Sequence, residues 1–388
     1  MKRGKLPIGT SIFTALVILG AVTVAMRYIN GLGAVTNLSD GRPWGLWISF
    51  DVYCGVALAA GGFIVAAVVY IFNLKKYQPL ARPALLTAFL GYTLVIFALL
   101  VDLGQPWYIW HAIIYWNVHS PLFEVAVCVM MYTTVLALEF SPAIFERFNW
   151  HIPLRIIRAI QIPLVIAGVV LSTLHQSSLG STLLVMPETL HPLWYTPLLP
   201  LFFLLSAIAV GLAMVIFETT LSTRVFGHKL NLDILSGLGK AIPYILGLYL
   251  LIKLVDLGVG GELGLVFTAY PQNLLWWGEV IIGVILPIIL FSMPSVRQSR
   301  RALFWSAVLI IIGLILNRFN VTMLGLEMRP GFSYFPHWME FAITAGLVAD
   351  SLLVVWLANR FLPMTHRKEI MAGKDEQWKL REEAELKN

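Results

Sequence analysis

Residues 46–72 read LWISFDVYCGVALAAGGFIVAAVVYIF, an apolar run in which Asp51 is the only charged residue. A helix of this length crosses the hydrocarbon core of a bilayer, which is about 30 Å thick. An ionisable side chain inside such a run costs free energy unless the protein uses it. The stretch therefore predicts a membrane-spanning helix that carries a functional carboxylate.

The same pattern recurs along the chain, which is 59% hydrophobic and 12% charged. Soluble domains carry roughly 25% charged residues. The runs are continuously apolar rather than alternating, which excludes a transmembrane β-barrel. We expect an all-α membrane protein with ten transmembrane helices, at 9–28, 46–72, 82–104, 120–140, 156–178, 198–221, 238–257, 274–293, 302–320 and 338–360.

The expected helices suggest a division of the chain into two four-helix bundles with two peripheral helices. The first helix lies within 1–30 and the last within 337–362. Between them we expect one bundle at 43–180 and a second at 195–325, followed by a cytoplasmic tail at 363–388.

Basic residues alternate between the loops. Arg27, Arg42, Arg318 and Arg329 fall on one side of the membrane. The other side receives Lys2, Arg3, Lys5, Lys75, Lys76, Arg82, Arg147, Arg155, Arg158, Arg224, Lys229, Lys240, Arg297, Arg300 and Arg301. Because Lys and Arg favour the cytoplasmic side, we expect both termini to be cytoplasmic. This topology also accounts for the net charge of +6, so we do not interpret that charge as nucleic-acid binding.

The expected outer loops at 105–119, 176–197 and 258–273 contain no Lys or Arg and are rich in Trp, Tyr and Pro. An interfacial aromatic belt explains part of this composition, but it does not explain the length of the loops. We interpret them as a docking surface for another subunit. A folded lid without a partner is the alternative.

Four titratable side chains are expected near the outer face: Asp51 about 10 Å deep in the second helix, Asp102 and His175 at helix ends, and Glu124 one turn into its helix. Antiparallel neighbours in a bundle bring such groups within reach of each other. Trp44 and Tyr53 would add an aromatic wall and a hydroxyl group.

This set of residue types fits a quinone. A quinone needs an apolar cleft that opens to lipid, a hydrogen-bond donor at each carbonyl oxygen and groups that exchange two protons. Histidine and carboxylate groups suit proton transfer. We therefore interpret Asp51, Glu124, His175 and, more weakly, Asp102 as a quinone-binding and proton-transfer site. Packing or capping roles are the alternative, above all for Asp102 at a helix end.

A second set of polar residues lies in the later helices. Lys253, Asp256, Glu279, Arg318 and Glu340 fall at helix ends, and salt bridging within the second bundle is the simplest interpretation. A proton path is the alternative, formed by Glu139 and Glu218 near the inner helix ends, by Lys253, and by Asp350 in the middle of the last helix.

We expect no haem or metal to be bound by this chain. Cys54 and Cys128 lie in separate apolar runs and form no CxxC pair. None of the eight histidines is expected in the middle of a helix, and no two have the spacing of a haem axial pair.

Several segments resemble the NrfD/PsrC family of membrane subunits, in particular the ten-helix branch that contains HybB and DsrP. The resemblance covers nearly the whole chain and is carried by PWGLWISFD at 43–51, DLG at 102–104, NVHSPLFE at 117–124, HQSSLGS at 175–181 and HPLW at 191–194.

The resemblance implies a haem-free and metal-free subunit of the prokaryotic inner membrane, with quinone or menaquinone as its substrate. It also implies a ferredoxin-like iron–sulfur subunit on the outer face and a catalytic subunit beyond it, such as a nickel–iron hydrogenase. The quinone pocket of the family lies in the first bundle near the outer surface. A transporter or proton channel, or a passive membrane anchor, remains the alternative.

Overall fold

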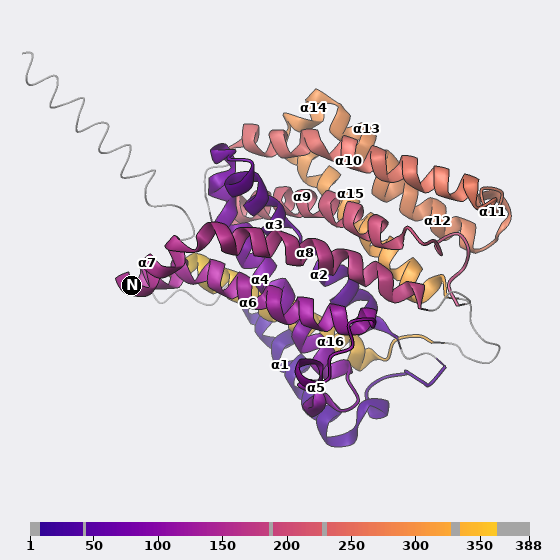
Figure 1. The fold of residues 1–388 in the computed structure, drawn as a ribbon, viewed down its shortest axis with the longest axis horizontal. Coiled ribbons are helices and arrows are strands. Elements are labelled where there is room, and N and C mark those ends of the chain that lie inside the picture. Colours follow the sequence, from indigo (N-terminus) through magenta and orange to yellow (C-terminus); the bar gives the residue numbers. More distant parts are fainter. Residues whose placement is uncertain (1–7, 42–43, 186–188, 227–230, 327–333, 363–388) are drawn as a thin grey trace, which may run out of the picture.

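The computed structural model describes residues 8–41, 44–185, 189–226, 231–326 and 334–362, which are nearly all helical (Figure 1). Within these ranges, ten helices are long and apolar enough to cross a membrane. The expected ten-helix, all-α membrane fold is therefore confirmed.

Seven of the spans are continuous helices or nearly so, namely the last span and α1 (Ile8–Asn30), α4 (Gln78–Asp102), α6 (Pro121–Phe148), α8 (Gln161–Leu184), α9 (Leu199–Phe226) and α10 (Leu232–Val259). The last span is α16 (Trp338–Phe361). Three spans contain π-helical turns. The second span comprises η2 (Trp47–Cys54), α2 (Gly55–Leu58), α3 (Gly61–Ala66) and η3 (Ala67–Ile71). The eighth span comprises α12 (Gln272–Val280), η6 (Ile281–Ile285) and α13 (Leu286–Ser292). The ninth span comprises α15 (Arg300–Phe319) and η7 (Asn320–Leu324).

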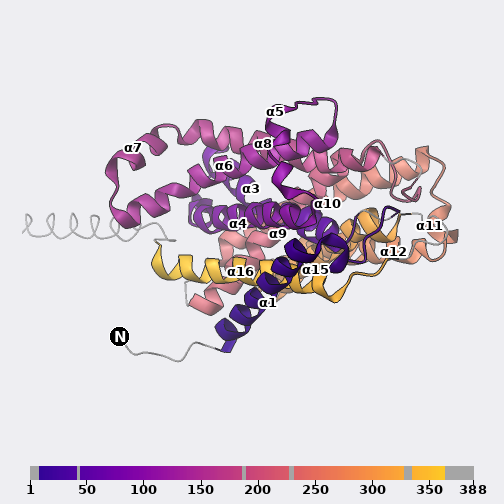
Figure 2. The same ribbon diagram turned by 90° about the horizontal axis from the view of Figure 1, so that it is seen from below.

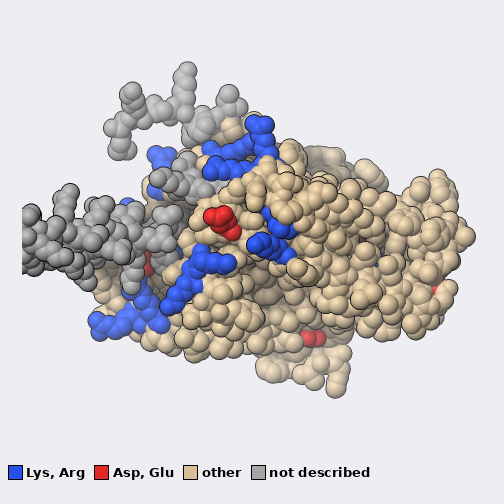
Figure 3. Space-filling view, turned by 90° about the horizontal axis from the view of Figure 1, so that it is seen from above, with Lys and Arg blue, Asp and Glu red and all other residues tan. Residues whose placement is uncertain are grey.

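The short elements lie between the spans. They are η1 (Leu32–Ala34), η4 (Lys75–Tyr77), η5 (Pro106–Tyr108), α5 (His111–Ile114), α7 (His151–Ala159), α11 (Leu265–Thr268) and α14 (Pro294–Arg297). Basic side chains gather at one end of the molecule, as Figure 3 shows for one face. We call this end, with η4, α7 and α14, the basic end, and the end with η5, α5 and α11 the aromatic end.

One predicted boundary is wrong in a way that matters. The fifth helix was expected to end at 178, but α8 continues to Leu184. The hydroxyls of small polar residues there are satisfied within the helix, because they donate back to its own carbonyls, as Ser178 does to Leu174 O at 2.8 Å. His175 therefore lies nine residues before the end of α8, roughly 14 Å from it, rather than at a helix end.

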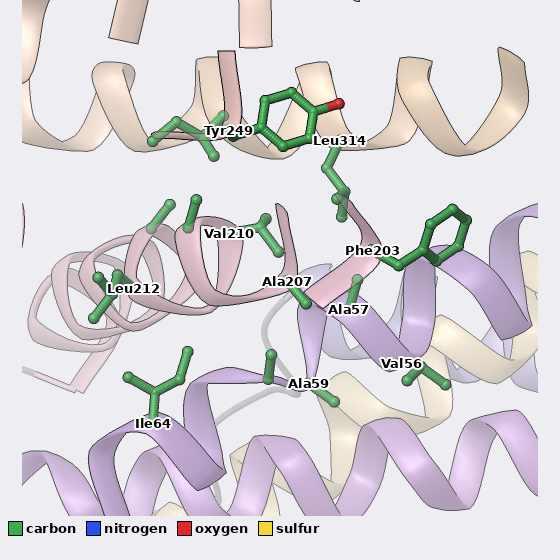
Figure 4. Packing of buried hydrophobic residues seen from close by; sticks show 14 of the residues in the cluster. Val56, Ala57, Ala59, Ile64, Phe203, Ala207, Val210, Leu212, Tyr249 and Leu314 are labelled. Atoms are coloured by element: carbon green, nitrogen blue, oxygen red, sulfur yellow. The ribbon is translucent and has the colours of Figure 1, made fainter. Parts of the chain in front are cut away.

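The spans pack into two groups and one pair. The second span, α4, α6 and α8 contact each other in cyclic order, and so do α9, α10, the eighth span and α15. Helix α9 also contacts α8 and the second span, so one hydrophobic core runs through both groups. Figure 4 shows its small side chains, among them Ala207 and Val210, between the second span and α10. Helices α1 and α16 pair with each other and lie against α4 (Figure 2). The division of the chain into domains stays a prediction.

Glycine allows the closest crossings. A Cβ on Gly20 of α1 would stand 2.9 Å from the Cα of Gly346 in α16, and a Cβ on Gly283 would stand 2.7 Å from the Cα of Gly313 in α15. Side chains larger than hydrogen would push these helices apart. Such contacts are a main source of helix association in membranes, where lipid is as apolar as the protein.

Candidate functional site

Asp51 is a buried carboxylate in the first π-helical turn of the second span. Its side chain is 1% exposed. Its Oδ2 accepts a hydrogen bond of 2.7 Å from the Thr344 hydroxyl of α16, and its Oδ1 has no protein partner among the described residues. π-Helical turns are rare and frequently mark functional sites. The carboxylate therefore keeps one oxygen available to a ligand.

Asp51 lines a large cavity of about 1250 Å³, which we call the groove. Side chains of α4, α9 and α16 and of the second span form most of its surface, and they are largely apolar, such as Phe50, Leu90 and Leu94. Asp51 is the fifth residue of its span, so the groove reaches to within roughly 6 Å of the aromatic end of that span. An apolar cavity with few polar groups is typical of a binding site for a small hydrophobic molecule.

Glu218 of α9 is the second carboxylate in the membrane-spanning part of the groove. It is partly buried, and Thr87 of α4 stands within hydrogen-bonding range. At the basic end the groove is bounded by Lys75, Lys76 and Asp233. The groove thus carries acidic groups at intervals from the aromatic end to the basic end.

Tyr53 points away from the groove. Its hydroxyl shares a hydrogen bond with the Thr182 hydroxyl of α8. Its ring packs edge-on to Phe203, with centroids 5.8 Å apart, and lies 6.2 Å from the ring of Trp44. Trp44 and Tyr53 therefore come together as expected, but Tyr53 faces α8 and α9 while Asp51 faces α16.

His175 is fully buried in the core of the first group. Its ring lies 5.5 Å from that of Tyr92, which in turn packs edge-on to Tyr132 at 4.6 Å. Both nitrogens of His175, the two tyrosine hydroxyls and the Ser172 hydroxyl are buried and form no well-aligned hydrogen bond in the described part of the chain, although Ser172 stands close to both tyrosine hydroxyls. Buried polar atoms normally have a partner, and ordered water often serves.

Glu139 extends this set toward the basic end. A Cβ on Gly168 of α8 would stand 3.6 Å from both a Glu139 carboxylate oxygen and a Tyr132 ring carbon. Four residues therefore follow one another through the first group, in the order Glu139, Tyr132, Tyr92 and His175. We call these four residues the polar line.

Asp102 and Glu124 lie elsewhere. Glu124 is exposed in the first turn of α6, where a negative charge favours the helix N-terminus. Asp102 is the last residue of α4, in the electrostatic field of Arg27 and Glu340. Arg27 is buried and donates to the carbonyls of Val101, at 2.7 Å, and Leu103. Asp51, Glu124 and His175 therefore have separate surroundings, and the expected single cluster is not formed.

Glu340 has a structural role. It accepts hydrogen bonds from the Tyr334 hydroxyl at 2.5 Å and from the amides of His337 and Asn37. The Tyr334 hydroxyl also accepts from the Leu46 amide at 2.9 Å. The pKa of Tyr334 is raised mainly by burial and secondly by the hydrogen bond to Glu340, so the hydroxyl stays protonated and can donate. These bonds fix the start of α16, which carries Thr344, against the start of the second span.

Lys253 and Glu279 form a buried ion pair in the second group, with Nζ and Oε1 2.5 Å apart. Glu279 also accepts from Trp194 Nε1 at 3.1 Å and from Asn320 Nδ2 at 2.7 Å. The expected salt bridging in this group is confirmed for the pair. Asp256 instead accepts from the Thr196 hydroxyl at 3.0 Å.

Arg318 of α15 contacts α9 within the second group, near the aromatic end. Its guanidinium lies 3.7 Å from the centroid of the Phe203 ring and donates to the Ser206 hydroxyl at 2.8 Å. Asp350, by contrast, is exposed in the middle of α16 and does not line the groove. Of the expected path residues, only Glu218 is part of the groove and only Glu139 of the polar line.

Comparison with known proteins decides the family. Residues 34–328 match the family described as polysulphide reductase, NrfD. The chain belongs to the NrfD family. The match covers the second to ninth spans and leaves the α1–α16 pair outside it. Thr344, which donates the hydrogen bond to Asp51, therefore lies outside the segment that matches the NrfD family.

Individual relatives are similar over most of their length. The chain is 40% identical to a protein of Nitratidesulfovibrio vulgaris over 91% of this chain and 93% of that protein. It is 34% identical to the probable Ni/Fe-hydrogenase 2 b-type cytochrome subunit of Escherichia coli, over 91% of each. It is 30% identical to the menaquinone reductase integral membrane subunit of N. vulgaris, over 86% of each.

The name of the E. coli relative raises the question of haem in this NrfD-family chain. Among the described residues, His175 is the only histidine inside a span, and its ring faces Tyr92. A haem held between two histidines needs two imidazoles that face each other across it. Nor do the described residues contain a group of three or more His, Cys, Asp or Glu that could hold a metal ion. Haem held between two histidines does not fit the described spans.

Sequence reasoning missed several residues of these sites. Five of them are hydroxyl residues inside apolar runs, where a single hydroxyl side chain gives no sequence pattern: Thr344, Tyr92, Tyr132, Thr182 and Ser172. Only a depth argument, such as the one applied to Asp51, could have singled out the two tyrosines. The partners of each residue depend on the packing of helices far apart in the sequence.

Proposed function

We propose that this protein is the quinone-interacting membrane subunit of a respiratory oxidoreductase, and that the groove holds the quinone ring near Asp51. The observation that carries the proposal is the groove of about 1250 Å³, which is apolar and has a buried carboxylate near its aromatic end. Support also comes from the relatives, one of which is a menaquinone reductase membrane subunit.

The chemistry assigns Asp51 a proton-transfer role. Conversion of a quinone to a quinol adds two electrons and two protons at the two ring oxygens, and the reverse reaction removes them. The free Oδ1 of Asp51 exchanges protons with one ring oxygen, while Thr344 holds Oδ2 and fixes the orientation of the carboxylate. Phe50 and Leu94 line the adjacent wall and exclude water.

We propose that the electrons come from or go to a partner, and the relatives support this because they are named as subunits of larger enzymes. We propose that a ferredoxin-like iron–sulfur subunit docks on the loops of the aromatic end, with a catalytic subunit such as a nickel–iron hydrogenase beyond it. Trp107, Tyr115 and Trp116 support this surface, because each is more than 60% exposed. Exposed aromatic patches are typical of interfaces.

The charge distribution supports an orientation. We propose that the basic end is cytoplasmic, that both termini lie there and that the membrane is the inner membrane of a prokaryote. The ring site would then open near the extracytoplasmic face, on the side of the docked iron–sulfur subunit.

The polar line favours a second function, proton movement through the first group. Glu139, Tyr132, Tyr92 and His175 place exchangeable protons along the bundle core. Water held by the unpartnered hydroxyls and ring nitrogens would connect them. This function complements quinone turnover and does not replace it.

The test is Asp51→Asn in the assembled complex. We expect quinone-linked turnover to fall by about 100-fold, the usual effect of removing a positioned acid–base group, while reduction of a soluble dye by the catalytic subunit stays unchanged. Asp256→Asn is the matched control, because it makes the same change outside the groove. Full quinone-linked activity in Asp51→Asn would favour the passive anchor.

A further inference from the structure

A second cavity lies at the basic end, between η4 of the first group and α10 and α14 of the second. Its volume is about 490 Å³. Lys76, Lys240 and Arg297 line it, together with the single carboxylate of Asp233. We call it the basic pocket.

The basic pocket carries an excess of two positive charges, from three cations and one carboxylate. In the described ranges the ion pairs are Arg82–Glu146, Arg158–Glu146 and Lys253–Glu279, so the three cations of the pocket are not held by acids. Arg297 is fixed in the wall by donating to the carbonyls of Phe291 and Ser292. The ammonium of Lys76 lies 4.8 Å from the centroid of the Tyr77 ring. The pocket is thus arranged for an anion.

The basic pocket adjoins the groove. Lys76 and Asp233 line both cavities. Immediately beyond them the groove is lined by apolar side chains such as Leu80 and Leu235. From Leu80 to Leu94, α4 follows the groove for roughly 21 Å toward Asp51. A cationic pocket therefore lies directly beside one end of a long apolar groove.

We propose that this site binds an anionic phospholipid, with its phosphate among Lys76, Lys240 and Arg297 and an acyl chain in the basic half of the groove. A quinone is uncharged and would not pair with the cations of the basic pocket. A soluble phosphate has no acyl chain to fill the apolar groove. Basic pockets between membrane helices on the cytoplasmic side are known to bind anionic lipid headgroups. The lipid occupies the end of the groove opposite the ring site, so this inference does not depend on quinone binding.

The test is native mass spectrometry of the full chain in detergent with phosphatidylglycerol. The variant is K76Q/K240Q, which removes two exposed charges and leaves Arg297 to hold the carbonyls of α13. We expect its affinity to fall by about thirtyfold, as two interfacial cations at about 1 kcal/mol each predict. R147Q/R155Q is the matched control, because it removes two exposed charges of the basic end outside both cavities.

Two further probes separate the headgroup from the chain. Phosphatidylcholine should bind at least tenfold more weakly than phosphatidylglycerol, and neither inorganic phosphate nor glycerophosphoglycerol should displace the lipid. Unchanged binding in K76Q/K240Q, or equal loss in R147Q/R155Q, would overturn the proposal. Equal binding of phosphatidylcholine would show that only the apolar groove binds lipid, without a role for the cations. Displacement by inorganic phosphate would show that the pocket binds a free anion. Either result also contradicts the proposal.

Discussion

The Thr344 hydroxyl donates a hydrogen bond of 2.7 Å to Asp51 Oδ2, joining two residues that are 293 positions apart in the chain. The bond connects α16, which lies outside the part shared with the family profile, to the carboxylate in the wall of the groove. It leaves the other oxygen of Asp51 free for a ligand. The geometry of the proposed quinone site therefore depends on how α16 packs against the second span.

Replacing Thr344 by Val should impair quinone chemistry without unfolding the protein, because it removes the hydrogen bond and keeps the side-chain shape. A hydrogen bond to a charged group is worth about 1.5–3 kcal/mol, so quinone-linked turnover should fall by roughly 10- to 100-fold. Thr344→Ser keeps a hydroxyl and should retain most of the activity. Equal turnover in the Val variant and the parent would show that Thr344 does not position Asp51.

Tyr132→Phe should slow proton uptake without a loss of stability. The hydroxyl is buried and forms no well-aligned hydrogen bond in the described ranges, with Ser172 as its nearby neighbour, so its removal costs at most one weak hydrogen bond. Proton uptake during quinone turnover is measured in sealed vesicles, and stability is measured by thermal melting in detergent. Tyr244→Phe, on the exposed surface of α10, is the control. If Tyr132→Phe takes up protons at the parent rate, the polar line does not carry them.

Breaking the buried ion pair should destabilise the fold. Glu279→Gln leaves the Lys253 ammonium without its acid in the protein interior, which typically costs about 3–5 kcal/mol. Glu146→Gln breaks partly exposed pairs and should cost about 1 kcal/mol or less. The melting temperature in detergent should therefore fall clearly for the first variant and little for the second. Equal melting temperatures would argue that Lys253 is solvated rather than held by Glu279.

Gly283→Ala should weaken the contact between the eighth and ninth spans. The new methyl group would stand 2.7 Å from the Gly313 Cα, so the helices must separate, at a cost of about 1–3 kcal/mol. Gly247→Ala in α10 meets no atom within 4 Å and should be neutral or slightly stabilising, because alanine favours the helix. Thermal melting of both variants measures the difference, and an unchanged Gly283→Ala would mean that this crossing is not tightly packed.

Local sequence patterns were sufficient for the ten spans and for the alternation of basic residues, because a span requires only enough consecutive apolar residues to cross the bilayer. They were weaker at helix ends. Pro187 follows Leu184 closely in the sequence, but the polar residues from His175 to Ser178 suggested an earlier end for α8, so His175 was placed too near the surface. The expectation of one cluster of Asp51, Glu124 and His175 was wrong because depth alone does not say which way a side chain points around its helix.

Apolar length and charge are properties of consecutive residues, so the amino-acid sequence was enough to predict a ten-helix membrane protein with acidic groups in its spans. Three arrangements depend on the packed fold: Asp51 accepts a hydrogen bond from Thr344, Tyr92 and Tyr132 lie between Glu139 and His175, and a cationic pocket adjoins an apolar groove. Each of these arrangements joins side chains from helices distant in sequence, and the rotation and crossing of those helices are set by packing at contacts such as Gly20–Gly346.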